Sequence, residues 1–355
     1  MKIGLFILIS LALIGCSKKS VDSPPNDGLP HNITTNGLPF AVTVVETSES
    51  KEWADITMLA LTYFERKEYD KLEGLAAEGR SVEESWPDGN WKVVPVYAGL
   101  ELSSSEQDDV WIARQKSIEE WIQARSASIT ARVTLARHLT DFAWKARGNG
   151  YANTVSEAAG ELFAERLAQA SAVLKEAMSL KEKCPVYWTT MMKIGLGLQA
   201  SKTQFDNIFR QATQAWPDYA PNYTQRAKFL LPRWYGDEGE WETDLARSVD
   251  QIGGEKGDML YAQVVLAMRG YSEHHNILED SKGLSWERID RGWDAIEKKF
   301  PDSLEAISAH ANMAGLAGDR EKAKKCLMKT GGKVTLNQWS AKGEFIDFAN
   351  WALGQ

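Results

Sequence analysis

A helical period of apolar side chains runs through most of this chain after residue 53, and it constrains the fold more than any other feature. Trp111, Ile118, Ile122, Ile129 and Val133 follow one another in steps of seven, four, seven and four residues. Such steps keep the apolar side chains on one side of an α-helix. The pattern predicts two helices between residues 108 and 147. Its continuation along the chain predicts an all-α fold.

Local signals add boundaries to this pattern. A break near Lys67 divides an early helix pair. Thr154 and Glu157 have the spacing of a capping box, which predicts a helix start at Thr154 and a helix that runs to about residue 180. Residues 93–102 are rich in β-branched side chains and fit a short strand, which Pro95 restricts to the edge of a sheet.

The second half of the chain has regularly placed prolines. Pro185, Pro217 and Pro301 each stand at a predicted helix start, and the first two are 32 residues apart, close to the length of one helical hairpin repeat. After Pro301, a series of alanines and the pair Gly318-Asp319 resemble a tetratricopeptide half-unit. We therefore predict a tetratricopeptide-like α-solenoid or irregular helical repeat array rather than a closed bundle.

The first residues have the pattern of an export signal. Met1-Lys2 precedes an apolar run of about a dozen residues, which is too short for a permanent membrane span. The run ends in Leu13-Ile14-Gly15-Cys16, which resembles the bacterial lipobox. We predict a signal peptide at 1–15 and lipidation of Cys16, with a plain secretory signal as the alternative. Ser17 in place of aspartate favours the outer membrane.

The mature chain divides into three predicted parts. Residues 16–50 are rich in Ser, Pro, Asn and Gly and form a disordered tether, with a reach of roughly 30 Å. Residues 51–269 form a helical repeat domain, and residues 270–355 form tetratricopeptide-like helices. The formal net charge of −8 argues against nucleic acid and against an anionic partner in general.

No motif predicts catalysis, a metal or a cofactor. A Gly-x-Ser-x-Gly elbow is missing from the sequence, and only His274 and His275 are adjacent among the histidines. The Gly195–Ala200 stretch matches a dinucleotide fingerprint, but it ends a helical run instead of opening one, so close helix packing explains its glycines better. Five acids within 237–244 fit the first turn of a helix better than a calcium site. The sequence does not decide whether Cys184 and Cys326 form a disulfide bond.

Two segments resemble the bacterial family known as domain of unknown function 4034. The first is Phe142-Ala143-Trp144 followed by Ala146-Arg147-Gly148-Asn149-Gly150-Tyr151, with Ser128-Ile129-Thr130-Ala131-Arg132 upstream, and the second is Leu231-Pro232-Arg233-Trp234-Tyr235-Gly236. The resemblance covers about 53–269. It implies a Trp-rich, tetratricopeptide-like helical architecture in a bacterial protein, and it supplies no catalytic residues.

The predicted binding surface consists of aromatic and basic side chains from these two segments. Trp, Tyr and Arg are the residues that most often anchor protein interfaces, because they bury a large area and still offer hydrogen-bond donors. The candidates are Arg132, His138, Trp144, Arg147 and Tyr151 on one side of the array, and Arg233, Trp234 and Tyr235 on another. For Trp188, Trp216 and Trp293 we favour a role in packing between helices.

These features lead to three hypotheses on function. The first is a lipid-anchored, periplasm-facing scaffold that binds another protein of the cell envelope. The second is a carbohydrate- or peptidoglycan-binding module that uses exposed tryptophan. The third is an enzyme whose site is assembled from distant helices.

Overall fold

The computed structural model describes residues 38–80, 85–148, 150, 154–272 and 276–354. Within these residues the regular structure is almost entirely helical, with two strands of two residues each. The predicted all-α fold is confirmed. Among the described residues, the structure contains no helix with the length and apolar character that a membrane span requires.

Several predictions concern residues outside this description. They are the signal peptide, the lipidation of Cys16, most of the tether, and the predicted binding residue Tyr151. His274 and His275 also lie outside the described residues.

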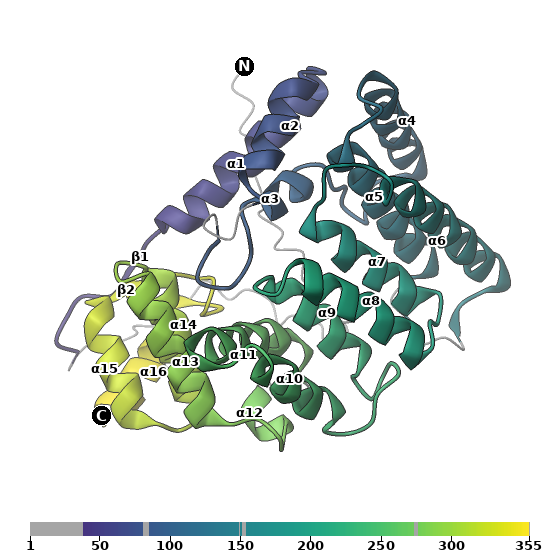
Figure 1. The fold of residues 1–355 in the computed structure, drawn as a ribbon. Coiled ribbons are helices and arrows are strands. Elements are labelled where there is room, and N and C mark those ends of the chain that lie inside the picture. Colours follow the sequence, from purple (N-terminus) through teal and green to yellow (C-terminus); the bar gives the residue numbers. More distant parts are fainter. Residues whose placement is uncertain (1–37, 81–84, 149, 151–153, 273–275, 355) are drawn as a thin grey trace.

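Six helices follow the strand β1 in the first part of the chain (Figure 1). In order, the elements are β1 (Thr43–Val44), α1 (Ser48–Glu65), α2 (Tyr69–Glu78), α3 (Val93–Ala98), α4 (Asp108–Ala124), α5 (Ile129–Arg147) and α6 (Glu157–Ala177). The break between α1 and α2 lies at Lys67, which has a positive φ of 55°. The predicted helix boundary near Lys67 is therefore confirmed.

The second part of the chain continues with short helices and one more strand. In order, they are α7 (Pro185–Gly197), α8 (Lys202–Ala215), α9 (Ala220–Phe229), α10 (Glu240–Asp250), α11 (Gly254–Met268), the 3₁₀ helix η3 (Arg269–Tyr271), α12 (Ile277–Asp280), α13 (Trp286–Lys299), α14 (Leu304–Leu316), α15 (Arg320–Thr330), β2 (Lys333–Val334) and α16 (Lys342–Leu353). The predicted Gly318-Asp319 turn joins α14 to α15, and the Asp319 side chain caps α15.

One corner between helices occurs three times. Arg125, Trp216 and Phe300 each end a helix in an extended conformation, with φ/ψ of −136°/69°, −141°/72° and −126°/66°. In each case the amide of this residue still bonds to the last turn of the helix behind it, and the next helix begins four residues further on. The same corner therefore joins α4 to α5, α8 to α9 and α13 to α14.

Two of the three prolines lie before the helices that they were predicted to begin. Pro185 is the first residue of α7, as predicted. Pro217 and Pro301 instead lie in the turn before α9 and α14, which begin three residues after each proline. Proline disfavours the helical conformation of the residue before it, so it ends the preceding helix there.

Residues 93–102 contain a helix, and the predicted strand is wrong. Pro95 is the third residue of α3, where its missing N–H has no partner in a helix anyway. Val93, Val96 and Tyr97 are buried on one side of this helix. Proline lacks an N–H donor, and the first turn of a helix accommodates this as well as the edge of a sheet does.

The helix α6 begins and ends at other residues than the sequence predicted. Ser156, not Thr154, is its N-cap and accepts a hydrogen bond from the Ala159 amide. The helix ends at Ala177 rather than near residue 180. Lys183 donates to the carbonyl oxygens of Met178 and Leu180, which satisfies two acceptors in the turn that follows.

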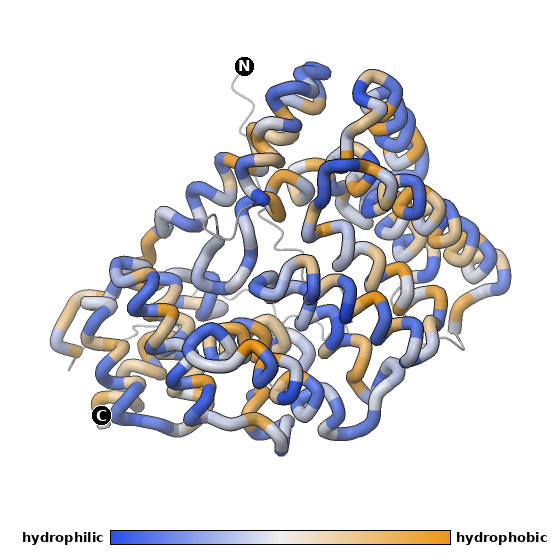
Figure 2. The backbone as a smooth tube through the Cα atoms, in the orientation of Figure 1, coloured by the Kyte–Doolittle hydropathy of each residue, from blue (hydrophilic) through white to orange (hydrophobic). Residues whose placement is uncertain are grey.

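The helices pack around three hydrophobic clusters. The first lies among the early helices and extends to Tyr219, and the second runs from Met192 to Met313. The third joins Val42, just before β1, to residues of α14, α15 and α16. Figure 2 shows the alternation of hydrophobic and hydrophilic residues along the helices that this packing requires. The predicted division into two helical parts near residue 269 stays a prediction.

The beginning of the described chain contacts its end. The strand β1 pairs in parallel with β2, beside α14 and α15 (Figure 1). Next to this pair, one carboxylate oxygen of Glu305 accepts hydrogen bonds from Thr47, Ser50, Thr335 and Asn337 at 2.6–3.2 Å. These contacts tie the start of α1 to the α14–α16 region.

Candidate functional site

Two of the sequence-predicted residues that were placed on different sides come together in the structure. Trp144, near the end of α5, and Trp234, in the turn after α9, meet with their ring centroids 5.9 Å apart in an edge-to-face arrangement. Tyr235 extends this contact, because its hydroxyl donates to the Leu196 carbonyl oxygen on α7 at 3.1 Å. The two predicted segments therefore form one site rather than two.

Arg147 and Phe163 complete this group. The ring of Trp144 lies 4.9 Å from Phe163, and the Arg147 guanidinium carbon lies 5.4 Å from the Trp144 ring centroid. Arg147 also donates to the carbonyl oxygens of Gly148 and Gly150, which holds it at the end of α5. Burial raises the pKa of Tyr235, and the nearby Arg147 partly opposes that rise. We call Trp144, Arg147, Phe163, Trp234 and Tyr235 the aromatic cluster.

Two glycines allow this close packing. A Cβ atom on Gly197 would lie 2.5 Å from Leu167 Cδ1 and 2.9 Å from Phe163 Cζ, so a larger side chain would force these two side chains of α6 to move. This agrees with the packing role predicted for the Gly195–Ala200 stretch. A Cβ atom on Gly236 would lie 1.9 Å from the Leu230 carbonyl oxygen, which makes glycine necessary at the end of the turn that carries Trp234.

Arg132 and His138 lie apart from the aromatic cluster. His138 is 5% exposed, and its ring lies beside those of Trp111 and Phe142, which stack on each other. It is thus a core residue and not part of a surface. Arg132 is half-buried and donates to the Ser128 carbonyl oxygen one turn earlier on α5. Among the predicted residues that the structure describes, only Trp144, Arg147, Arg233, Trp234 and Tyr235 belong to one region.

Two lysines that nothing in the sequence singles out lie near the predicted residue Arg233. Lys228, at the end of α9, lies with its ammonium 4.9 Å from the ring centroid of Tyr271, and the Arg233 guanidinium carbon lies 5.1 Å from the same centroid. Lys193 on α7 is close enough to Lys228 to affect its charge. We call Lys193, Lys228 and Arg233 the cationic cluster. Lys193 and Lys228 carry no recognisable sequence signal, because single basic residues on helices usually face solvent.

The electrostatics of Lys228 are unfavourable within the described chain. Burial lowers the pKa of Lys228 to about 8, and the like charges of Lys193 and Arg233 contribute to this shift. Lys193 has a carboxylate partner, Asp141, whereas Lys228 contacts no carboxylate among the described residues. A buried cation without a counter-ion destabilises the protein unless a ligand supplies the charge. An anionic group bound here would remove this penalty.

The aromatic and cationic clusters share the same helices. On α5, Asp141 pairs with Lys193 one turn before Trp144. On α7, Lys193 lies one turn before Leu196, the acceptor for Tyr235. Arg233 and Trp234 are neighbours in the chain, and Arg233 is exposed. The two clusters therefore form one continuous candidate site with apolar and positively charged parts.

The tryptophan side chains offer little free indole surface. Seven of the 14 are buried, the other seven are half-buried, and none is exposed. Trp293 is fully buried, and Trp188 and Trp216 pack against the hydrophobic clusters, as the predicted packing role requires.

The five acids within 237–244 are engaged in ion pairs and helix contacts. Glu240 begins α10, as predicted, and pairs with Lys202 at 2.8 Å. Asp244 pairs with Arg226 at 3.0 Å. These pairs line a groove of about 440 Å³. Because Glu240 and Asp244 already have cationic partners, and the five acids form no group of converging ligand atoms among the described residues, the structure gives no support for a calcium site here.

A separate group of side chains has the composition of a metal site. Glu297, His310 and Cys326 come from α13, α14 and α15, and none of them belongs to the aromatic or cationic cluster. Cys184 and Cys326 are both free and buried, and Cys184 lies instead 3.2 Å from the Tyr97 hydroxyl. The disulfide that the sequence left open is not formed.

Comparison with known proteins gives no further assignment: no family model, no curated protein and no solved structure matches this chain. The resemblance to domain of unknown function 4034 stays a prediction.

Proposed function

We propose that this chain is a lipid-anchored helical repeat protein of the bacterial cell envelope, and that it binds an acidic segment of another protein at the joined aromatic and cationic clusters. The single observation that carries the binding proposal is the position of Lys228. It is a half-buried cation among like charges, and one of these, Arg233, is the chain neighbour of Trp234 in the Trp144–Trp234 contact.

The repeat architecture is supported by recurring local geometry. The helices α7, α9 and α11 begin 35 and 34 residues apart, close to the 34-residue tetratricopeptide period. The same corner joins three pairs of helices. In repeat arrays each unit packs mainly on its neighbours, and the preformed surface binds an extended segment with little loss of conformational entropy.

The acidic character of the proposed partner follows from local charge. The net charge of −8 averages over the whole chain and disfavours anionic partners in general. At the site itself, however, three cations converge and only Lys193 has a carboxylate partner among the described residues. The adjoining tryptophans and Tyr235 provide the apolar contacts that usually anchor a protein partner.

Tryptophan fluorescence of the purified protein tests this proposal. We expect a short oligoglutamate peptide to shift the emission and an oligolysine of the same length to leave it unchanged. The variant Arg233→Glu should weaken oligoglutamate binding by about tenfold or more, which corresponds to a loss of about 1.4 kcal/mol. Trp234→Phe should remove the spectral response.

A matched control is Trp351→Phe. Trp351 is half-buried like Trp234, and Arg320 lies 5.4 Å from its ring centroid, as Arg147 does from that of Trp144, but Trp351 packs on the third hydrophobic cluster. It should keep the response. If soluble peptidoglycan fragments shift the emission and oligoglutamate does not, the glycan hypothesis replaces this one. Turnover of a substrate that is lost on replacing one polar residue would favour the enzyme hypothesis.

The partner itself can be captured in intact cells. A photo-crosslinking residue at position 233 should trap a protein with an acidic segment, whereas one at the exposed Arg247, which pairs with Asp244, should not. Equal capture at both positions would contradict a specific site.

The membrane anchor rests on Cys16. We expect Cys16→Ser to move the protein from the membrane fraction to the soluble fraction and to change its electrophoretic mobility, because two or three acyl chains provide the attachment. A variant that stays in the membrane fraction with unchanged mobility would contradict lipidation.

A further inference from the structure

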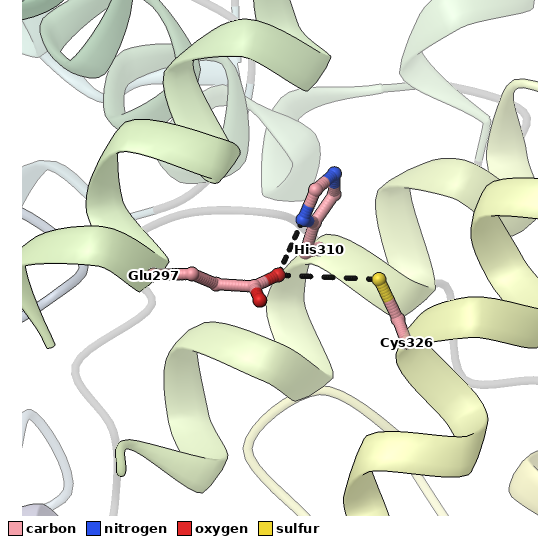
Figure 3. A group of neighbouring side chains, drawn as sticks. All are labelled: Glu297, His310 and Cys326. Atoms are coloured by element: carbon pink, nitrogen blue, oxygen red, sulfur yellow. Dashed lines mark hydrogen bonds and ion pairs between the residues drawn. The ribbon is translucent and has the colours of Figure 1, made fainter. Parts of the chain in front are cut away.

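Three helices place one potential metal ligand each at a common point. Figure 3 shows Glu297, His310 and Cys326 directed toward one another from α13, α14 and α15. His310 Nδ1 lies 2.6 Å from Glu297 Oε1, and Cys326 Sγ lies 3.9 Å from the same oxygen. The side chain of His310 has no exposed surface, and Cys326 is 1% exposed.

We propose that Glu297, His310 and Cys326 bind a divalent cation of the zinc class. Tetrahedral zinc with bonds of about 2.0–2.3 Å places its ligand atoms about 3.3–3.8 Å apart. The Cys326–Glu297 separation lies just above this range and has to shorten slightly, and the His310–Glu297 separation has to widen by about 0.7 Å when the cation replaces the proton between them. Three protein ligands leave one tetrahedral position for a water molecule.

The second nitrogen of His310 has the partner expected in such a site. Its Nε2 lies 2.8 Å from Asp290 Oδ1, so the imidazole donates on that side and can offer the Nδ1 lone pair to a cation. Histidine ligands of zinc usually donate their other N–H to a carboxylate, which fixes the ring orientation. Lys322 in turn pairs with Asp290 at 2.7 Å and holds it in place.

The ligand types select the class of cation. A thiolate and an imidazole favour zinc and related metals, whereas magnesium and calcium prefer oxygen ligands only. The charges of one thiolate and one carboxylate balance a divalent cation. Lys329 contacts Glu297 through Oε2, so Oε1, the oxygen nearest to His310 and Cys326, stays available.

The alternative is a buried charge network that needs no metal. His310, Glu297, Asp290, Lys322 and Lys329 already satisfy one another through hydrogen bonds and ion pairs. The two cases differ in the role of Cys326, which is a ligand in the first and a packing residue in the second. This difference determines the experiment.

The test uses the purified full-length protein after removal of bound metal with a chelator. On titration with Co²⁺ alone, we expect one equivalent to bind, with a thiolate-to-cobalt charge-transfer band in the near ultraviolet that Zn²⁺ then removes. Cys326→Ser should abolish the band and weaken binding at least tenfold. Asp290→Asn, which changes the histidine's partner and none of the three ligands, should weaken binding by about 10–100-fold. The control Cys184→Ser alters the other buried thiol and should leave band and affinity unchanged.

The absence of the band in the wild-type protein would overturn the proposal, as would a band that persists in Cys326→Ser or disappears in Cys184→Ser. If Cys326→Ser does not fold, alkylation of the wild-type protein tests the proposal instead. Under mild denaturation, Zn²⁺ should slow the alkylation of Cys326 but not of Cys184, as measured by mass spectrometry of the two peptides. Equal rates with and without Zn²⁺ would contradict the site.

Discussion

His138 on α5 and His310 on α14 are both buried, but only His310 has carboxylates beside it. The His138 ring lies 5.1 Å from Trp111 and 6.2 Å from Phe142, and its Nε2 has no hydrogen-bond partner among the described residues. Burial lowers the pKa of His138 to about 4, so this side chain is neutral in the folded protein near neutral pH.

His310 has the opposite charge behaviour in an equally buried position. Burial alone would lower its pKa, but its contacts with Cys326, Glu297 and Asp290 raise it to about 9. The two lysines Lys228 and Lys322 repeat this contrast. Burial lowers the pKa of Lys228 to about 8, whereas Asp290 and Asp294 raise that of Lys322 above its usual value despite burial.

The comparison therefore separates two polar regions of the molecule. In the α13–α15 region His310, Glu297, Asp290 and Lys322 each have a partner of the opposite sign, which stabilises the fold. Around Lys228 the described chain does not provide such a partner, which points to a ligand from outside. Partners, more than burial, decide whether a buried ionisable group serves stability or binding.

Removal of the central charge of the balanced region should have the largest effect. In metal-free protein, His310→Gln leaves Glu297 and Asp290 without their shared cation and should lower the free energy of unfolding by about 3 kcal/mol or more. Urea unfolding measures this. His138→Leu, which removes a histidine without such partners, should change the stability by about 1 kcal/mol or less. Equal losses in both variants would remove the basis of the comparison.

The second expected effect is a pH dependence that belongs to His138. Its folded-state pKa of about 4 lies below the unfolded value of about 6.5, so protonation favours the unfolded chain. This contribution to stability is complete above about pH 6.5 and decreases as the pH falls toward 4, by about 2–3 kcal/mol in total. The difference in unfolding free energy between wild type and His138→Leu, followed across this range, should show that loss. A difference independent of pH would contradict a neutral buried His138.

A smaller loss is expected from Lys322→Met. This change removes the ammonium that lies 2.7 Å from Asp290 and 3.0 Å from Asp294, and it should lower stability by about 1–2 kcal/mol in thermal or urea unfolding. Lys298→Met, at an exposed pair with Glu255, should have almost no effect and serves as the control. A neutral Lys322→Met would show that the α13–α15 region does not depend on its ion pairs.

Local features of the fold could be predicted from the sequence. The apolar stripe that contains Trp111 and Val133 predicted α4 and α5, and Gly318-Asp319 predicted the turn between α14 and α15. Both features depend on side chains that are close to one another in the sequence. Where one local rule allowed two structures, the prediction failed. Pro95 fits a sheet edge and the first turn of a helix equally well.

The sites depend on contacts between distant parts of the chain and could be predicted only in part. Trp144 and Trp234 were singled out separately, but nothing in the sequence indicates that they touch. Lys228 gave no signal, since its burial and its lack of a carboxylate partner arise from three-dimensional packing. Glu297, His310 and Cys326 are also too far apart in the chain to form a short metal-binding motif.

The central claim, that the site around Lys228 is completed by an anion from outside, is tested most directly by the stability of Lys228→Met with and without a short oligoglutamate peptide. We predict that this variant is about 1–2 kcal/mol more stable than the wild type in the absence of peptide, because a buried charge is removed, and that the peptide stabilises only the wild type. Lys193→Met, which leaves Asp141 unpaired, should instead lose stability. A less stable Lys228→Met, or one that the peptide stabilises as much as the wild type, would contradict the account.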